Sequence, residues 1–290
     1  EIASGDWSSD VCSSDLWEIK AKMISELPDL TTMVNYRDDS NPMNIILGNI
    51  QLRNIHYYDI EGGKTFEGKK HSRLNINMGY HQTDNAVAYS LVFDKQTGVS
   101  TVQPISVNGN YRIDLGIGYT RPLDKKEKLS IDNQASFNYN HNVDMAMVQG
   151  ATQSQRSIVN NWKISDVLKL NYRLDDNYEF TLHGGGTYYL IKSQREGFNN
   201  IHAGDYNIGV NVQVALPWKL QLTTDLTMFA RRGYQLSEMN TTDWIWNTQL
   251  SRSFINKKLL VKLQGFDILR QLSNTQYLMN AQGRTETWNN

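Results

Sequence analysis

The stretch YEFTLHGGGTYYL, residues 178–190, decides the fold class because apolar and polar side chains alternate along it on both sides of three glycines. One face carries the apolar residues Tyr178, Phe180, Leu182, Tyr188 and Leu190, and the other face carries polar side chains. A period of two is that of a half-buried β-strand and not that of a helix. Residues 206–216 and 219–230 repeat the alternation. The pattern predicts long amphipathic strands.

Alternation extends over most of the chain and predicts about eleven or twelve strands. The further segments are 72–82, 86–94, 99–107, 110–121, 128–141, 159–174, 240–254 and 258–267, with an additional edge strand at 275–288. Most of these segments are about ten to sixteen residues long, whereas strands of globular sheets average about five or six. Tilted strands that cross a bilayer need such lengths. The predicted fold is an all-β, antiparallel transmembrane β-barrel, present in part and without a plug domain.

Composition excludes several classes of protein. The 290 residues carry 29 Lys+Arg against 30 Asp+Glu, so there is no excess of positive charge of the kind that binds nucleic acid. Aromatic residues make up 10% of the chain and there are only 5 Pro residues, which is atypical of a disordered chain. The longest apolar runs fall far short of the roughly 18 residues of a membrane helix. An all-β chain is the remaining interpretation.

The predicted connections differ in length at the two ends of the strands. Tight turns are expected at 174–177, 216–218 and 255–257, with a slightly longer one at 121–127. Longer polar links are expected at 142–158, 193–204, 232–240 and 268–275. Outer-membrane barrels place short turns in the periplasm and long loops outside the cell. The arrangement therefore predicts an outer-membrane location.

Aromatic residues recur ten positions apart on the apolar face. The pairs are Trp162 and Tyr172, Tyr178 and Tyr188, and Trp244 and Phe254. At about 3.3 Å per residue and about 40° of tilt, ten residues span roughly 25 Å, the height of the apolar band of such barrels. We interpret these six residues as girdle residues at the two membrane interfaces. The alternative is that aromatics simply decorate long strands.

The opposite face is polar and of mixed charge. Its candidate lumen-facing residues are Glu179, Thr181, His183, Asn211, Gln213, Gln221 and Asp225. A hydrated interior, or one packed against a polar plug, needs such a composition. The set does not identify a ligand.

Two charged residues fall on the apolar face, Asp166 and Arg252. We expect both to lie near strand ends, where a charge reaches the membrane interface at little cost. A register shift at a β-bulge is the alternative explanation.

The sequence offers no pattern of catalytic or metal-binding residues. Its six His are scattered without zinc-binding spacing, and no phosphate-binding loop or nucleophile motif occurs. Asp175 and Asp176 fit turn chemistry better than acid-base catalysis. We expect no enzyme activity, no cofactor and no metal.

The N-terminal segment EIASGDWSSDVCSSDL, residues 1–16, stands apart from this pattern. Residues 6–16 match the translation of a common sequencing adapter, and the sole cysteine, Cys12, lies among them. We interpret residues 1–16 as an artefact. Residues 17–70 are then a lead-in segment with a loop and the first barrel edge, and residues 71–290 form barrel.

Residues 24–55 carry a recognisable arrangement: Pro28, Leu30, Ser40, Asn41, Pro42, Gly48, Asn49 and Leu52. In these residues the chain resembles the outer-membrane β-barrel family related to TonB-dependent receptors, in which P-x-L precedes S-N-P and G-N-P-x-L ahead of the barrel strands. Ile50 stands where that family usually has Pro. The segments 107–110, 121–126 and 267–269 are similar as well.

The resemblance implies nutrient uptake through the outer membrane, energised by an inner-membrane complex that acts through an N-terminal plug. It also implies a C-terminal barrel fragment that lacks the plug and the final strand, so the strand at 72–82 and residues 284–290 should form open edges. The implied partners are outer-membrane lipid, the plug, the energising complex and an unknown nutrient ligand. Two alternatives remain: a complete twelve-stranded passive pore or membrane enzyme, and a soluble or surface all-β binding module.

Overall fold

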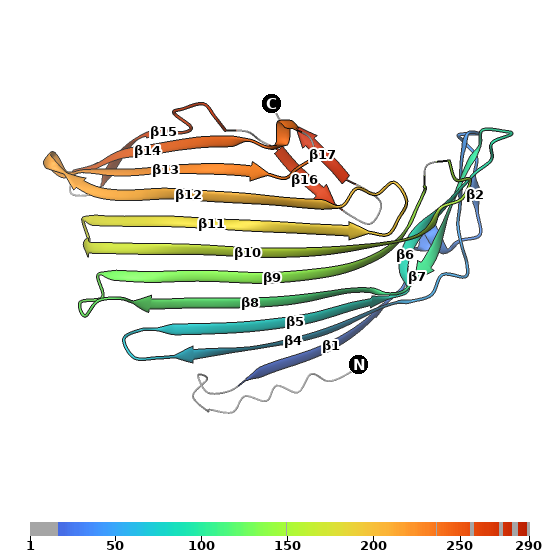
Figure 1. Cartoon of the computed structure of the whole chain (residues 1–290), viewed down its shortest axis with the longest axis horizontal. Helices are drawn as coiled ribbons and strands as arrows, with labels where there is room; N and C mark the ends of the chain where they lie inside the picture. Colours follow the sequence, from blue (N-terminus) through green and yellow to red (C-terminus); the bar gives the residue numbers. More distant parts are fainter. Residues whose placement is uncertain are drawn as a thin grey trace.

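The computed structural model describes residues 17–148, 150–235, 237–255, 258–272, 275–279 and 284–288, the last two segments by their backbone. Eleven strands form one antiparallel sheet, and neighbours in the sheet follow one another along the chain apart from two inserted pairs, one between the first and second strands of the sheet and one between the third and fourth (Figure 1). The predicted all-β, antiparallel fold class is confirmed. The strands are β1 (Glu18–Glu26), β4 (Ile55–Glu67), β5 (Arg73–Asp84), β8 (Asn110–Pro122), β9 (Leu129–Ala146), β10 (Gln155–Asp175), β11 (Tyr178–Ser193), β12 (Ile201–Leu216), β13 (Leu220–Arg232), β14 (Thr242–Phe254) and β15 (Leu259–Gly265).

Strands β9 and β10 are longer than the alternation predicted. Their pairing continues to Gln155 opposite Ala146, so much of the predicted link at 142–158 is strand. Val143, Ser157 and Val159 are buried there, and their packing favours continued pairing where the sequence is rich in loop-forming residues.

Two predicted wall strands lie outside the large sheet. β6 (Ala86–Phe93) and β7 (Ser100–Val107) join β2 (Arg37–Asp38) and β3 (Asn44–Leu47) in a separate four-stranded sheet, in the order β2-β3-β7-β6. The prediction that 86–94 and 99–107 belong to the barrel wall is therefore wrong. Positive φ angles at Asn85 (55°) and Gly109 (105°) turn the chain away after β5 and back before β8. Thr83 consequently pairs directly with Asn110.

The connections sort by end, as predicted. The turns after β4, β8, β10 and β12 lie at one end of the sheet, the left in Figure 1. One of them is the 3-10 turn η1 (Pro217–Lys219), in which Trp218 has a φ of 63°. The links after β9, β11 and β13 lie at the other end, together with the four-stranded sheet and the short helix α1 (Leu30–Met33). We refer to these as the turn end and the link end.

The open edges differ from those expected. The strand at 72–82 is not an edge, because β5 pairs with β4 on one side and β8 on the other. The lead-in segment supplies two wall strands, β1 and β4, and β1 is the edge. β16 (Thr275–Met279) and β17 (Arg284–Trp288) pair with each other in a two-stranded sheet. Within the described ranges no pairing joins β1 to β15, so the large sheet is open.

The pairing register keeps one set of side chains on each face across all eleven strands. Opposite positions such as Leu170, Leu182 and Val210 share the apolar face, and Asn171, Thr181 and Asn211 share the polar face. Over the middle strands the apolar residues are the more exposed; Leu182 is 51% and Ile208 51% exposed. Among the described residues, no helix is long and apolar enough to span a membrane.

Candidate functional site

All seven predicted lumen-facing residues lie on the polar face of β11, β12 and β13. Glu179 pairs with Gln213, and Thr181 pairs with Asn211, which in turn pairs with Asp225. The remaining two residues, His183 and Gln221, share this face by register. The sequence alternation therefore brings the set together, while its exposure to a lumen stays a prediction.

Hydrogen bonds link these residues along the wall. Thr181 Oγ1 donates to Asn171 Oδ1 at 2.9 Å, and His183 Nε2 lies 3.2 Å from Thr227 Oγ1. Gly209, opposite His183, leaves the space that the His183 ring occupies, because a Cβ there would collide with His183 Nε2 at 2.6 Å. The polar face thus presents hydrogen-bond donors and acceptors that a ligand or a second protein surface can engage.

A second polar cluster lies on the same face of β4, β5 and β8, and it is absent from the sequence-based candidates. His81 is its centre: Nδ1 lies 2.7 Å from Asp59 Oδ1, and Nε2 lies 3.3 Å from Asp114 Oδ2. Arg112 Nε donates to the same oxygen of Asp114, and Asn138 Nδ2 donates to its other oxygen. The contact of His81 with Asp59 is a hydrogen bond, and the contact with Asp114 is an ion pair when the ring carries both protons. No local spacing reveals this cluster, because its members are far apart in sequence and meet through strand pairing.

A hollow of about 370 Å³ opens beside this cluster. Lys20 and Glu18, joined by an ion pair of 2.6 Å, lie at its margin on the edge strand β1. Gly63 and Gly79 contribute no side chain to the hollow. The hollow is therefore lined by both charge signs and by amide and imidazole groups.

Neither polar cluster forms a metal centre. In the described part of the chain no three His, Cys, Asp or Glu side chains converge in a way that could hold a metal ion. In the second cluster the two carboxylates contact opposite nitrogens of His81 and do not share one point.

The link between β13 and β14 folds onto the polar face at the link end. Tyr234 and Met239 pack with Val159, Ile191 and Ala203, which belong to the polar face of β10, β11 and β12. The Tyr234 hydroxyl donates to Asp205 Oδ1 at 2.8 Å. Burial, and then this hydrogen bond, raise the pKa of Tyr234 above its ordinary value. The link therefore covers part of the polar wall and is anchored there by both apolar and polar contacts.

The six predicted girdle residues all lie on the apolar face. Of these, Tyr172, Tyr178, Tyr188, Trp244 and Phe254 are 37–41% exposed. Trp162 belongs to a row of ring contacts that crosses four strands from Tyr80 through Tyr111 and Tyr139, with centroids 5.1–6.1 Å apart. The alternation alone did not single out the other three rings of this row. The assignment of the six girdle residues to two membrane interfaces stays a prediction.

Asp166 does not lie near a strand end, contrary to expectation. It follows the start of β10 by eleven residues and precedes its end by nine. The bulge in this strand lies between Arg173 and Asp175, so it does not turn Asp166 to the other face. Arg252 does lie near a strand end, two residues before the end of β14, with its guanidinium carbon 4.7 Å from the centre of the Phe254 ring.

Comparison with known proteins gives one family. The model of the Outer membrane protein beta-barrel family matches residues 14–185, which is more than half of the chain. No curated protein matches the chain.

Proposed function

The chain belongs to the outer membrane protein β-barrel family, and we propose that it forms part of the wall of a nutrient-uptake barrel in the outer membrane. The outer-membrane location follows from the family. In the proposed uptake mechanism, which resembles that of TonB-dependent receptors, a plug domain fills the lumen. An inner-membrane complex supplies energy through the plug. The polar face lines the lumen and the apolar face contacts lipid. The protein acts as a transporter and not as an enzyme.

The observation that carries this proposal is the open eleven-stranded wall. β1 and β15 are at opposite margins of the sheet and, in the described ranges, do not pair with each other (Figure 1). An eleven-stranded wall that is open within the described ranges fits a wide barrel better than a small closed one. Barrels of about 16 to 18 strands enclose an aqueous channel and those of about 22 strands a plugged lumen, whereas small barrels are filled by side chains. A complete twelve-stranded pore fits this wall less well.

The polar face supports the same proposal. It carries hydrogen-bonded clusters around His81 and His183, and a link that Tyr234 anchors onto the wall. A surface of this kind can bind a polar plug or a hydrophilic solute. The apolar face argues against a soluble binding module, since residues such as Leu182 and Ile208 are about half exposed over many neighbouring strands.

Two gene deletions test energised uptake. In a Gram-negative strain that carries the natural gene, one deletion removes this gene and the other removes the inner-membrane energising complex. Both strains are grown with vitamin B12, ferric chelates or oligosaccharides as the limiting nutrient. We expect the loss of this gene to abolish growth on one nutrient, and the loss of the energising complex to abolish growth on the same nutrient.

A high concentration of that nutrient is the control, because diffusion through general pores should restore growth of both strains. If the strain without the energising complex grows normally at limiting nutrient, the barrel is a passive pore. If the strain without this gene still accumulates the nutrient but fails to convert it, the barrel is an enzyme. Either result contradicts the proposal.

A further inference from the structure

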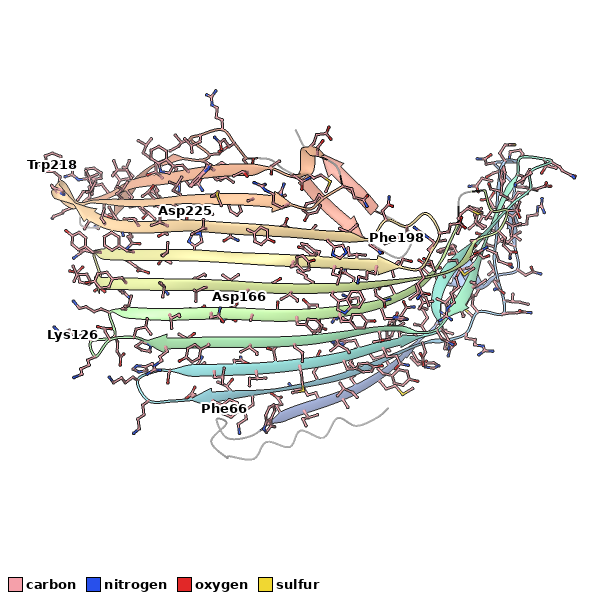
Figure 2. All side chains as sticks on the ribbon, viewed as in Figure 1. Phe66, Lys126, Asp166, Phe198, Trp218 and Asp225 are labelled. Carbon is pink, nitrogen blue, oxygen red and sulfur yellow. The ribbon has the colours of Figure 1, made fainter. Side chains whose placement is uncertain are left out.

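A carboxylate stands at the centre of the apolar face. Asp166 is exposed on this face between Ile164 and Leu168, which are 52% and 38% exposed. Figure 2 shows Asp166 midway along the sheet, far from Lys126 at the turn end and Phe198 at the link end. Because the apolar face of an outer-membrane barrel contacts lipid, Asp166 lies at mid-depth in the bilayer. An ionisable residue at this depth is costly and usually marks a functional contact.

The surroundings of Asp166 leave its charge without a counter-ion. Asn133 Nδ2 donates to Asp166 Oδ1 at 2.8 Å and also approaches the Val167 carbonyl at 3.3 Å. This amide is a neutral donor. None of the ion pairs formed by the described residues includes Asp166. The wall therefore holds the carboxylate in place and does not neutralise it.

The residues that pair with Asp166 have small side chains, and the Tyr206 ring lies beside one of them, 3.1 Å from where a Cβ of Gly186 would stand. The direct neighbours of Asp166 on the adjoining strands are Ala135 and Gly186. Gly184 lies diagonally opposite, and a Cβ there would meet nothing closer than 3.6 Å. Small residues around a polar side chain allow a second membrane-embedded backbone to approach closely, and a polar contact can then hold it.

We propose that the patch formed by Asn133, Ala135, Asp166, Gly184 and Gly186 docks a second membrane-embedded protein that presents a Lys or Arg at mid-depth. Charge complementarity selects this partner, because a buried cation is what the carboxylate lacks. A twofold contact between two copies of the chain, with its axis through the patch, would bring one Asp166 against another and is repulsive. Lipid headgroups lie about 15 Å away at the bilayer surface and cannot supply the cation. The proposal rests on the outer-membrane location and is independent of nutrient uptake.

Photo-crosslinking in the native membrane tests the patch. A photoreactive residue replaces Leu168 in the full-length protein, and a matched control places it at Ile60, which is 51% exposed on the same face but four strands away. We expect a protein adduct at position 168 and none at position 60. Mass spectrometry should place a Lys or Arg of the partner beside the crosslinked residue. Asp166→Asn, which keeps the size and one acceptor but removes the charge, should lower the yield at least tenfold.

Two further variants separate docking from a structural role. Asp166→Leu should abolish the adduct while heat-modifiable, surface-exposed barrel reaches the wild-type level or exceeds it. Asn133→Leu removes the amide that holds the carboxylate in place, so it should lower the adduct yield while the barrel still assembles. An adduct that persists in Asp166→Asn, an adduct with the chain itself, labelling of lipid alone, or failed assembly of Asp166→Leu would each overturn the proposal.

Discussion

Replacing Leu182 by Arg tests which face of the wall meets lipid. Leu182 lies on the apolar face of β11, 51% exposed, and pairs with Leu170 on β10 and Val210 on β12. An Arg on the lipid face near the bilayer midplane costs about 2 to 4 kcal/mol. At about 1.4 kcal/mol per tenfold, this cost lowers the folding equilibrium constant roughly 30- to 800-fold.

The matched control is Thr181→Arg, one residue earlier and on the polar face. Thr181 pairs with Asn171 and Asn211 in a polar environment, so an Arg there can hydrogen bond and should cost under about 1 kcal/mol. Both variants change one residue of the same strand to the same charged side chain. The difference between them isolates the environment of each face.

Two assays measure the difference in the full-length protein. Surface-exposed, heat-modifiable protein reports assembly in cells, and guanidinium unfolding in lipid vesicles reports stability. We expect Leu182→Arg to fail or nearly fail assembly and Thr181→Arg to assemble normally. If Thr181→Arg is the defective variant, the assignment of the faces is reversed. Equal effects would mean that neither face contacts lipid selectively.

Three further predictions concern the polar face. Tyr234→Phe removes the hydrogen bond to Asp205 and should cost about 1 kcal/mol, seen as faster limited proteolysis of the link. The folded-state pKa of Tyr234 is raised above the ordinary 10.0, so this hydrogen bond is fully present below pH 10 and weakens at higher pH. Above pH 10 the wild-type link should therefore become more sensitive to protease, and the link of Tyr234→Phe should not. Gly233→Ala should loosen the same link by 1 kcal/mol or more, since Gly233 has a φ of 80° and a Cβ would collide with the His202 carbonyl; unchanged proteolysis would contradict this. His81→Ala removes one partner of the Asp114 carboxylate. It should lower the free energy of unfolding, measured with guanidinium, by about 1 kcal/mol, or by less if water takes the place of the ring.

The sequence by itself determined the fold class and the composition of the two faces. In residues 178–183 each side chain alternates with a neighbour of opposite polarity, and successive side chains of a strand point to opposite faces. The assignment of Leu182 and Thr181 to opposite faces of the strand therefore follows from local geometry alone. The turn at Pro217 and Trp218 was likewise predictable, because turn residues act locally.

The alternation did not determine which strands share a sheet. Residues 86–93 and 100–107 alternate like wall strands, yet β6 and β7 form a separate sheet with β2 and β3. Alternation reports that one face of a strand is buried and does not identify the surface that buries it. Positive φ angles at Asn85 and Gly109 redirect the chain, so that β5 pairs with β8 and not with β6.

The tertiary structure alone decided the sites. His81 meets Asp59 and Asp114 because β4, β5 and β8 pair in one register, and those residues lie 22 and 33 positions away along the chain. Asp166 was visible in the sequence as a charge on an apolar face, but its central depth and its contact with Asn133 required the full extent of β10 and its pairing with β9. Local periodicity assigns a side chain to a face, whereas long-range hydrogen bonding between strands fixes its depth and its neighbours.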